Sequence, residues 1–173
     1  RKRVMLKLLT RDLGGLAGLD EVMASMTALA ELTVQRAQSC AMHTLEQQYG
    51  QPVGADSGQV QELLVIGMGK LGGGELNVSS DIDLIFVFPE DGDTNGARSI
   101  GNGDFFNRVG RKIIALINEV TADGFVFRVD MRLRPYGDSG ALVMSFAALE
   151  DYLVAQGREW ERYAWIKARV VSP

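Results

Sequence analysis

The chain has 173 residues, of which 46% are hydrophobic and 23% charged, a composition ordinary for a globular domain and unlike that of a disordered segment. Its net charge of −4 argues against a protein that coats nucleic acid, and its single cysteine, Cys40, excludes an internal disulfide and a cysteine-rich zinc site. Because of this charge we expect no DNA or RNA partner. No hydrophobic stretch approaches the roughly 20 residues that span a bilayer, so we expect no membrane partner and a cytoplasmic location.

Residues 1–58 are expected to form a helical segment that packs on the rest of the chain. Hydrophobic residues recur at helical spacing from Val22 to Leu45, and Asp20 stands where an N-cap would be, so about 25 residues should form one amphipathic helix. Residues 51–58 contain proline and glycine and are expected to be a loop.

Residues 59–173 alternate between strand and helix patterns. The predicted elements are a strand over 63–66, a short helix or turn over 70–77, a strand over 82–88, a polar mobile loop over 91–103, a long helix capped by Asp104, a strand over 125–133 with one charged face, a helix from Ser145 to 156 and another over 159–171. This order predicts an α/β (α+β) fold with a small mixed β-sheet flanked by helices.

Residues 67–86, GMGKLGGGELNVSSDIDLIF, contain two motifs with different chemistries. Three glycines follow a strand in the order G-x-G-x-x-G, and Glu90 stands where a dinucleotide-binding turn would place its ribose-binding acid. However, only about ten residues separate the glycines from the next strand, which is cramped for a crossover helix. The dinucleotide interpretation also leaves Asp81 and Asp83 unexplained, so we do not favour it.

Asp81 and Asp83 form an Asp-x-Asp pair at the start of a predicted strand. Residues i and i+2 of a strand point to the same face about 7 Å apart, so their carboxylates could bracket two divalent cations, as two-metal phosphoryl transfer requires. Hard oxygen ligands prefer Mg²⁺ or Mn²⁺. Asp130, on the charged face of the strand predicted over 125–133, could supply a third carboxylate. The alternative is that these aspartates only cap turns and face solvent.

Other residues around this motif are suited to phosphate, because glycine lets phosphate oxygens approach the backbone and arginine forks match phosphate geometry. The candidates for binding nucleotide or phosphate are Gly67, Gly69, Lys70, Gly72, Ser79, Ser80, Arg132 and Arg134. Arg128 shares the charged face, and these arginines could equally be structural partners of the aspartates. The sole histidine, His43, is expected to be structural or solvated, which disfavours a histidine triad or zinc hydrolase. Trp160, Tyr163 and Trp165 are expected to have a packing role.

Three stretches, GMGKLGGGELNVSSDIDLIF, FVFRVDMRLRPYGDSGALV and REWERYAWIKARVV, resemble the bifunctional glutamine synthetase adenylyltransferase/adenylyl-removing enzymes. These belong to the DNA polymerase β-like nucleotidyltransferase superfamily, and the resemblance covers roughly residues 60–171. Residues 77–83 are more similar to the amino-terminal, adenylyl-removing half of that family. The other half usually has an aromatic residue before the serines and leucine between the aspartates. Since the sequence begins at Arg1 without methionine, we expect a piece of a longer two-transferase chain.

The resemblance implies deadenylylation of glutamine synthetase by phosphorolysis, in which orthophosphate attacks the AMP phosphorus and gives ADP. Asp81 and Asp83 would be the metal-binding aspartates and Asp130 the third carboxylate. The implied partners are glutamine synthetase, the PII signalling protein and orthophosphate or ADP, with Mg²⁺ or Mn²⁺ as cofactor. Two alternatives stay open: ATP-dependent adenylylation on the same fold, and a catalytically silent module that binds nucleotide or PII.

Overall fold

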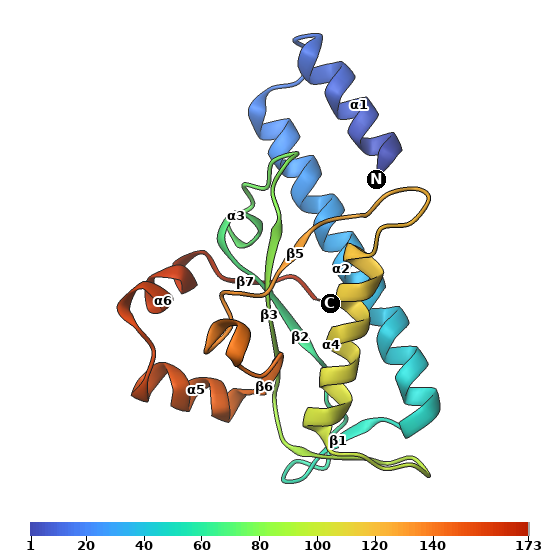
Figure 1. Ribbon diagram of the computed structural model, residues 1–173, viewed down its shortest axis with the longest axis vertical. Coiled ribbons are helices and arrows are strands. Elements are labelled where there is room, and N and C mark those ends of the chain that lie inside the picture. The colour runs from blue at the N-terminus through green and yellow to red at the C-terminus, as the bar shows by residue number, and fades with distance from the viewer. Residues whose placement is uncertain (173) are drawn as a thin grey trace.

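The computed structural model describes residues 1–172, which form a mixed β-sheet with helices on both faces (Figure 1). The helices are α1 (Lys2–Leu13), α2 (Leu19–Tyr49), α3 (Gly69–Gly72), α4 (Asn102–Asn118), α5 (Phe146–Ala155) and α6 (Glu159–Ala164), with 3-10 turns η1 (Gly137–Ser139) and η2 (Trp165–Lys167). The strands are β1 (Pro52–Gly54), β2 (Leu64–Gly67), β3 (Ile82–Phe88), β4 (Gly92–Thr94), β5 (Val129–Asp130), β6 (Val143–Ser145) and β7 (Arg169–Val170). The predicted fold class is confirmed. None of the helices among these residues combines the length and hydrophobicity needed to cross a membrane.

Strand β3 is the centre of the main sheet. It runs antiparallel to β2, which is in turn antiparallel to β7, and its other edge pairs in parallel with β5 at its start and β6 at its end. A dinucleotide-binding turn joins two parallel strands, so the antiparallel β2–β3 pair excludes that interpretation of the glycine motif. Glu90 is also engaged elsewhere, because its carboxylate accepts hydrogen bonds from the backbone N–H groups of Asp56 and Ser57.

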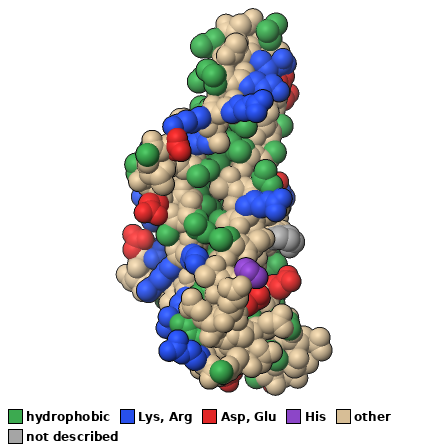
Figure 2. Space-filling model, turned by 90° about the vertical axis from the view of Figure 1, so that its right-hand side faces the viewer, with side chains coloured by type: hydrophobic (Ala, Val, Ile, Leu, Met, Phe, Trp, Pro, Cys, Tyr) green, Lys and Arg blue, Asp and Glu red, His purple; other side chains and the backbone are tan. Residues whose placement is uncertain are grey.

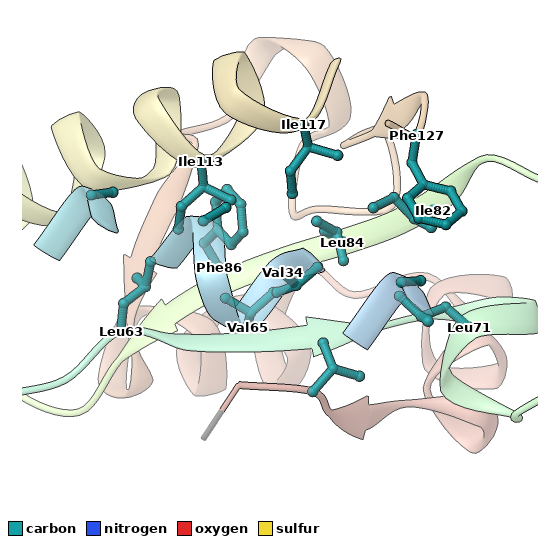
Figure 3. Close-up of a cluster of buried hydrophobic side chains, with 14 of the residues drawn as sticks. Val34, Leu63, Val65, Leu71, Ile82, Leu84, Phe86, Ile113, Ile117 and Phe127 are labelled. Carbon is teal, nitrogen blue, oxygen red and sulfur yellow. The ribbon is translucent and has the colours of Figure 1, made fainter. Parts of the chain in front are cut away.

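The two faces of β3 bury different residues. Ile82, Leu84 and Phe86 point into the larger core, where they meet side chains of α2 and α4 such as Val34 and Ile113 (Figure 3). The residues between them face the opposite side. There a smaller cluster packs against α5 and η2, and its buried members are Ile66, Met68, Ile85, Val87 and Leu149. Because side chains alternate along a strand, the aspartates that continue this odd-numbered series belong to the α5–α6 face of the sheet.

The long helices α2 and α4 cover one face of the sheet, as their hydrophobic stripes predict. Their starts differ from the predicted caps. Glycines in extended conformation, Gly18 and Gly101, occupy the N-cap positions, and neither has a side-chain cap hydrogen bond. Asp20 and Asp104 lie instead within the first turns, where a negative charge complements the helix dipole. The prediction of these aspartates as N-caps is therefore wrong by two to three residues. Ser145 is confirmed as the cap of α5, since its hydroxyl accepts from the N–H of Ala148.

Two segments predicted as loops contain a small sheet. Strands β1 and β4 pair antiparallel within residues 51–58 and 91–103, with Pro52 opposite Thr94. The Asn102 amide fastens this sheet to the start of α4 by donating to the backbone oxygens of Val53 and Glu90. The prediction of two plain loops was wrong because the partners are about 40 residues apart and neither segment has a strand pattern of its own.

The predicted strand over 125–133 and helix over 159–171 are both shorter than expected. Only Val129–Asp130 pair as β5, because the N–H groups of Val126 and Phe127 bond to the oxygen of Ile117 at the end of α4. The final helix stops at Ala164, and the chain then turns through η2 into β7, which pairs with β2. In both places a tertiary hydrogen-bonding partner overrides the local pattern.

The short helix α3 packs closely against the segment that follows α6. A methyl group added at Gly72 would lie 1.8 Å from the backbone oxygen of Lys167 and 2.4 Å from that of Gly67. Both obstacles are backbone atoms, so they cannot rotate out of the way. Gly72 therefore allows the approach of these two segments.

We expect Gly72→Ala to lower the free energy of unfolding by about 1–3 kcal/mol or more, because the added methyl forces the packed backbones apart. Urea denaturation followed by circular dichroism measures this change. Gly103→Ala is the matched control: it lies in α4 with open space around it, so its stability should stay unchanged or rise by up to about 1 kcal/mol. Equal stability of Gly72→Ala and the parent chain would contradict this account of the turn.

Candidate active site

Three carboxylates lie where β3 begins, at the junction with β5. Asp83 is the register partner of Asp130 in the parallel β3–β5 pair, so the two residues are neighbours on adjacent strands, about 4.8 Å apart. Asp81 lies two residues before Asp83 along the chain. The pKa of Asp83 is raised, first by partial burial and then by the negative charges of Asp130 and Asp81. The fold thus brings together the three aspartates that the sequence singles out.

Two of these carboxylates are engaged by arginines. The guanidinium of Arg128 pairs with Asp81 and also donates to the backbone oxygen of Ser79. Arg132 donates to Asp130 from its backbone N–H at 2.8 Å and from its guanidinium, and this hydrogen bonding lowers the pKa of Asp130. The arginines therefore are partners of the aspartates here, one of the two roles the sequence left open for them.

Unlike the carboxylates of Asp81 and Asp130, that of Asp83 accepts no hydrogen bond from the residues that the structure describes. It faces positive charge only at longer range, from Arg132 and Lys70. Within residues 1–172, no group of three or more His, Cys, Asp or Glu side chains converges closely enough to hold a metal in this conformation. The donor set still fits a hard divalent cation, since carboxylate oxygens are the ligands that Mg²⁺ and Mn²⁺ prefer. Joint coordination would require the three carboxylates to move closer together than they are in this conformation.

The turn before β3 carries polar groups beside the carboxylates. The ammonium of Lys70 lies 3.5 Å from the hydroxyl oxygen of Ser80. The hydroxyls of Ser79 and Ser80 both donate to the Asn77 side-chain oxygen, at 3.3 and 2.7 Å. Asn77 was not among the predicted site residues, although asparagine followed by two serines is a turn signal. The asparagine thus fixes the orientation of two predicted phosphate ligands.

The three motif glycines have different surroundings. Gly69 has a φ of +54°, and a side chain there would lie 3.5 Å from a carboxylate oxygen of Asp83, so the turn approaches the acidic group at this residue. At Gly67 an added methyl would meet Leu71 and Val171 at 2.9 Å, and Gly72 is restricted by backbone as described above. These two glycines serve packing between segments.

Arg134 points into the loop that follows β5. Its side chain is only 12% exposed, and one guanidinium nitrogen donates to the backbone oxygen of Met131 at 2.7 Å. The same nitrogen lies 3.5 Å from Asp138, and Nε is buried without a hydrogen-bond partner in the described part of the chain. Its charge contributes to the lowered pKa of Asp130, but its contacts hold the loop.

Arg132 lines two cavities. The first, of about 480 Å³, is open to the carboxylates, and its lining includes Asp81, Arg128 and Asp130. The second, of about 490 Å³, lies between the loop after β5 and helices α5 and α6; it is lined by Arg132, Tyr136, Gly137, Ser139, Tyr152, Gln156, Arg158, Trp160 and Glu161. We call it the aromatic cavity. Sequence reasoning missed it, although the turn-rich run RPYGDSG after Asp130 indicates a tight loop beside the acidic residues.

Outside this region the remaining predictions have mixed outcomes. His43 is exposed on α2 beside the Gln47 amide, and Figure 2 shows it on the face turned away from α5 and α6. This agrees with a solvated role. Of the aromatic residues expected to pack, Trp165 lies against the smaller hydrophobic cluster. Trp160 and Tyr163 do not pack as expected, because they are 52% and 75% exposed. Their short helix is held by the buried Glu161 instead, which leaves these rings at the surface.

The sequence is similar to one family of known proteins over nearly its whole length. The family described as glutamate–ammonia ligase adenylyltransferase matches residues 1–173. A bifunctional glutamine synthetase adenylyltransferase/adenylyl-removing enzyme of Chromobacterium violaceum is 64% identical over 99% of this chain, and its Nitrosomonas eutropha counterpart is 59% identical over 99%. A Neisseria meningitidis relative with the same description is 56% identical over the whole chain. The chain spans 19% of the length of each of these relatives.

The raised pKa of Asp83 predicts that the free energy of unfolding depends on pH. The folded chain binds this proton more tightly than the unfolded chain, so stability falls as the pH rises from the unfolded value, about 3.9, through the folded one. With EDTA present, Asp83→Asn should therefore raise the urea midpoint at pH 7, and the gain should vanish near pH 4. Asp151→Asn, at an exposed position of α5, should change little. A lower midpoint for Asp83→Asn at every pH would show that the carboxylate stabilises the fold.

Proposed function

The chain belongs to the glutamate–ammonia ligase adenylyltransferase family, and on this premise we propose that it removes AMP from adenylylated glutamine synthetase by phosphorolysis. The observation that carries the proposal is the pairing of Asp83 with Asp130 beside Asp81. The cationic side chains near these carboxylates are Arg128, Arg132 and Lys70. The choice of removal over attachment rests on residues 77–83, which resemble the adenylyl-removing half of the family.

In the proposed reaction, orthophosphate attacks the phosphorus of AMP that is esterified to a tyrosine of glutamine synthetase. A bond forms between an orthophosphate oxygen and that phosphorus, and the bond to the tyrosyl oxygen breaks. The products are ADP and a tyrosine whose oxygen takes up a proton. The reaction passes through a centre crowded with negative charge, so positioning and charge stabilisation supply most of the catalysis.

Asp81, Asp83 and Asp130 would hold Mg²⁺ or Mn²⁺ in this reaction. When bound, the metal supplies positive charge that neutralises the transferring phosphoryl group. Asp83 is suited to this role because its carboxylate is partly desolvated and no hydrogen bond contributes to its pKa. Asp81 and Asp130 would exchange their arginine partners for metal, which leaves Arg128 and Arg132 free to bind phosphate.

The cationic side chains would orient the two phosphates. Arg128 and Arg132 each pair with one of the carboxylates, and a guanidinium can bind two phosphate oxygens at once. Lys70 lies beside Gly69 in the glycine turn, and its ammonium is 3.5 Å from the hydroxyl oxygen of Ser80 in the turn before β3. Together these groups could hold orthophosphate in line with the tyrosyl ester.

We propose that residues 59–173 form the transferase unit and that residues 1–58 pack on it as a helical support. The relatives are much longer than this chain, which covers 19% of their length. Control by the PII signalling protein would therefore act through segments outside this sequence. The second activity in the relatives' description, adenylylation, would belong to such a segment too.

The test is the release of ADP from AMP-modified glutamine synthetase in the presence of orthophosphate and Mg²⁺. Asp81→Asn combined with Asp83→Asn should lower this rate by at least about a hundredfold, because charge stabilisation of several kcal/mol is lost. Calorimetric titration of Mn²⁺ into the same variants should show lost binding. ATP-dependent labelling of unmodified glutamine synthetase measures the opposite activity.

The chain offers a matched control in its second Asp-x-Asp sequence. Asp91 and Asp93 are both exposed and have the same spacing. Replacing both by Asn should leave ADP release and Mn²⁺ binding unchanged. Full turnover by the Asp81/Asp83 double variant would reject the site, and labelling by ATP without any ADP release would reject the proposed direction.

A further inference from the structure

We propose that the aromatic cavity binds the adenine base of the AMP group while its phosphate lies at the three carboxylates. The inference rests on the proposed function, because it names where the nucleoside of that substrate lies. It assigns a binding role to Tyr136, Gln156 and Trp160, none of which is needed to hold metal or phosphate.

The cavity is correctly placed for a nucleoside. It opens on the α5–α6 side of the sheet, the side to which Asp81 and Asp83 also belong by strand alternation. Arg132 lines both this cavity and the one at the carboxylates. A phosphate bound by Arg132 would therefore lie beside the aromatic cavity, within reach of its ribose and base. A volume of about 490 Å³ is enough for a nucleoside.

The lining of the cavity suits a flat aromatic ring. Tyr136 and Trp160 are 49% and 52% exposed, which leaves large ring surfaces open in a region that also holds two arginines. Bases stack on aromatic side chains and on guanidinium planes, and one such contact contributes substantially to binding. A phosphate or another simple anion has no aromatic ring that could stack on these side chains.

Gln156 supplies the group that can distinguish bases. It is exposed at the end of α5 and lines the cavity. A glutamine amide both donates and accepts, so it can pair with the N6 and N7 positions of adenine. Guanine presents an acceptor where adenine presents its amino group, and therefore cannot make the same pair.

The carboxylate of the acidic residue in the cavity is satisfied by two hydrogen bonds from the protein itself. One carboxylate oxygen of Glu161 accepts the Tyr152 hydroxyl at 2.6 Å, and the other accepts the N–H of Arg158 at 2.7 Å. The remaining charged groups are Arg132 and Arg158, which favour a nucleotide over a neutral ligand.

The wall of the aromatic cavity is held in place by contacts within the protein. Tyr136 has a φ of +60°, a conformation that costs a non-glycine residue about 1 kcal/mol or more. Its ring packs edge-on against Tyr152, with centroids 4.5 Å apart, and Tyr152 is itself held by Glu161. At Gly140 a methyl group would lie 2.0 Å from the oxygen of Pro135, so the loop closes tightly below the ring. The strained tyrosine is therefore kept in place at the mouth of the cavity.

Fluorescence of Trp160 tests the proposal directly. Trp165→Phe removes the other tryptophan of the chain, so the remaining signal comes from the cavity. With Mn²⁺ replaced by Mg²⁺ to avoid paramagnetic quenching, ADP should quench this signal, whereas inorganic diphosphate should not. Affinity for ADP should exceed that for GDP and CDP by about tenfold, the effect expected when one good paired contact is lost.

Replacing Gln156 should weaken binding of the base and leave binding of the phosphates unchanged. Gln156→Ala should weaken ADP binding about tenfold and leave diphosphate binding, measured by calorimetry, unchanged. Gln47→Ala, on the exposed side of α2, is the control and should bind ADP as the parent does. Equal quenching by diphosphate and ADP, or an unaltered ADP affinity in Gln156→Ala, would overturn the base site.

The outcome can be separated from that of the proposed function. If the Asp81/Asp83 double variant loses ADP release but Gln156→Ala keeps full ADP affinity, the chemistry stands and the base site is wrong. If adenine selectivity is present while AMP-modified glutamine synthetase gives no ADP, the base site stands and the direction of the reaction is wrong.

Discussion

The short parallel pairing of β3 with β5 is the interaction on which the site depends. Only two residue pairs make it, with Ile82 opposite Val129 and Asp83 opposite Asp130, and the N–H of Ile82 adds a bond to the oxygen of Arg128. Buried hydrophobic residues of the larger core anchor one side of this pair, while the carboxylates lie on the other. Apolar burial thus offsets the repulsion that results when acidic side chains are brought side by side.

The arginines give the acidic group two ways of balancing its charge. In this structure Arg128 and Arg132 pair with Asp81 and Asp130, and the pKa of Asp83 is raised. In the proposed substrate complex, metal would take over the carboxylates and phosphate would take over the arginines. In that complex each carboxylate and each arginine would face an opposite charge, so Asp83 too would gain a partner and no ion would be left unpaired.

The sequence predicts those parts of the fold whose signals are local. The stripe of α2, strand β3 and the Ser145 cap are confirmed, because periodicity and capping act over a few residues. Pairing between distant segments is different: β1 with β4 and β2 with β7 depend on partners that no local pattern names. The same limit applies to the site. Asp81, Asp83 and Asp130 could be chosen from their positions in strand patterns, whereas the engagement of Arg134 within its loop and the aromatic cavity arise from tertiary contacts.

Strand β7 has a consequence for anyone who shortens the chain. It covers the outer edge of β2, where the N–H of Val171 bonds to the oxygen of Val65 and the Val171 side chain is 2% exposed. A protein cut before this strand would present an uncovered row of backbone donors and acceptors next to apolar side chains. An uncovered edge of this kind can pair with strands of other molecules, so truncation there would favour aggregation.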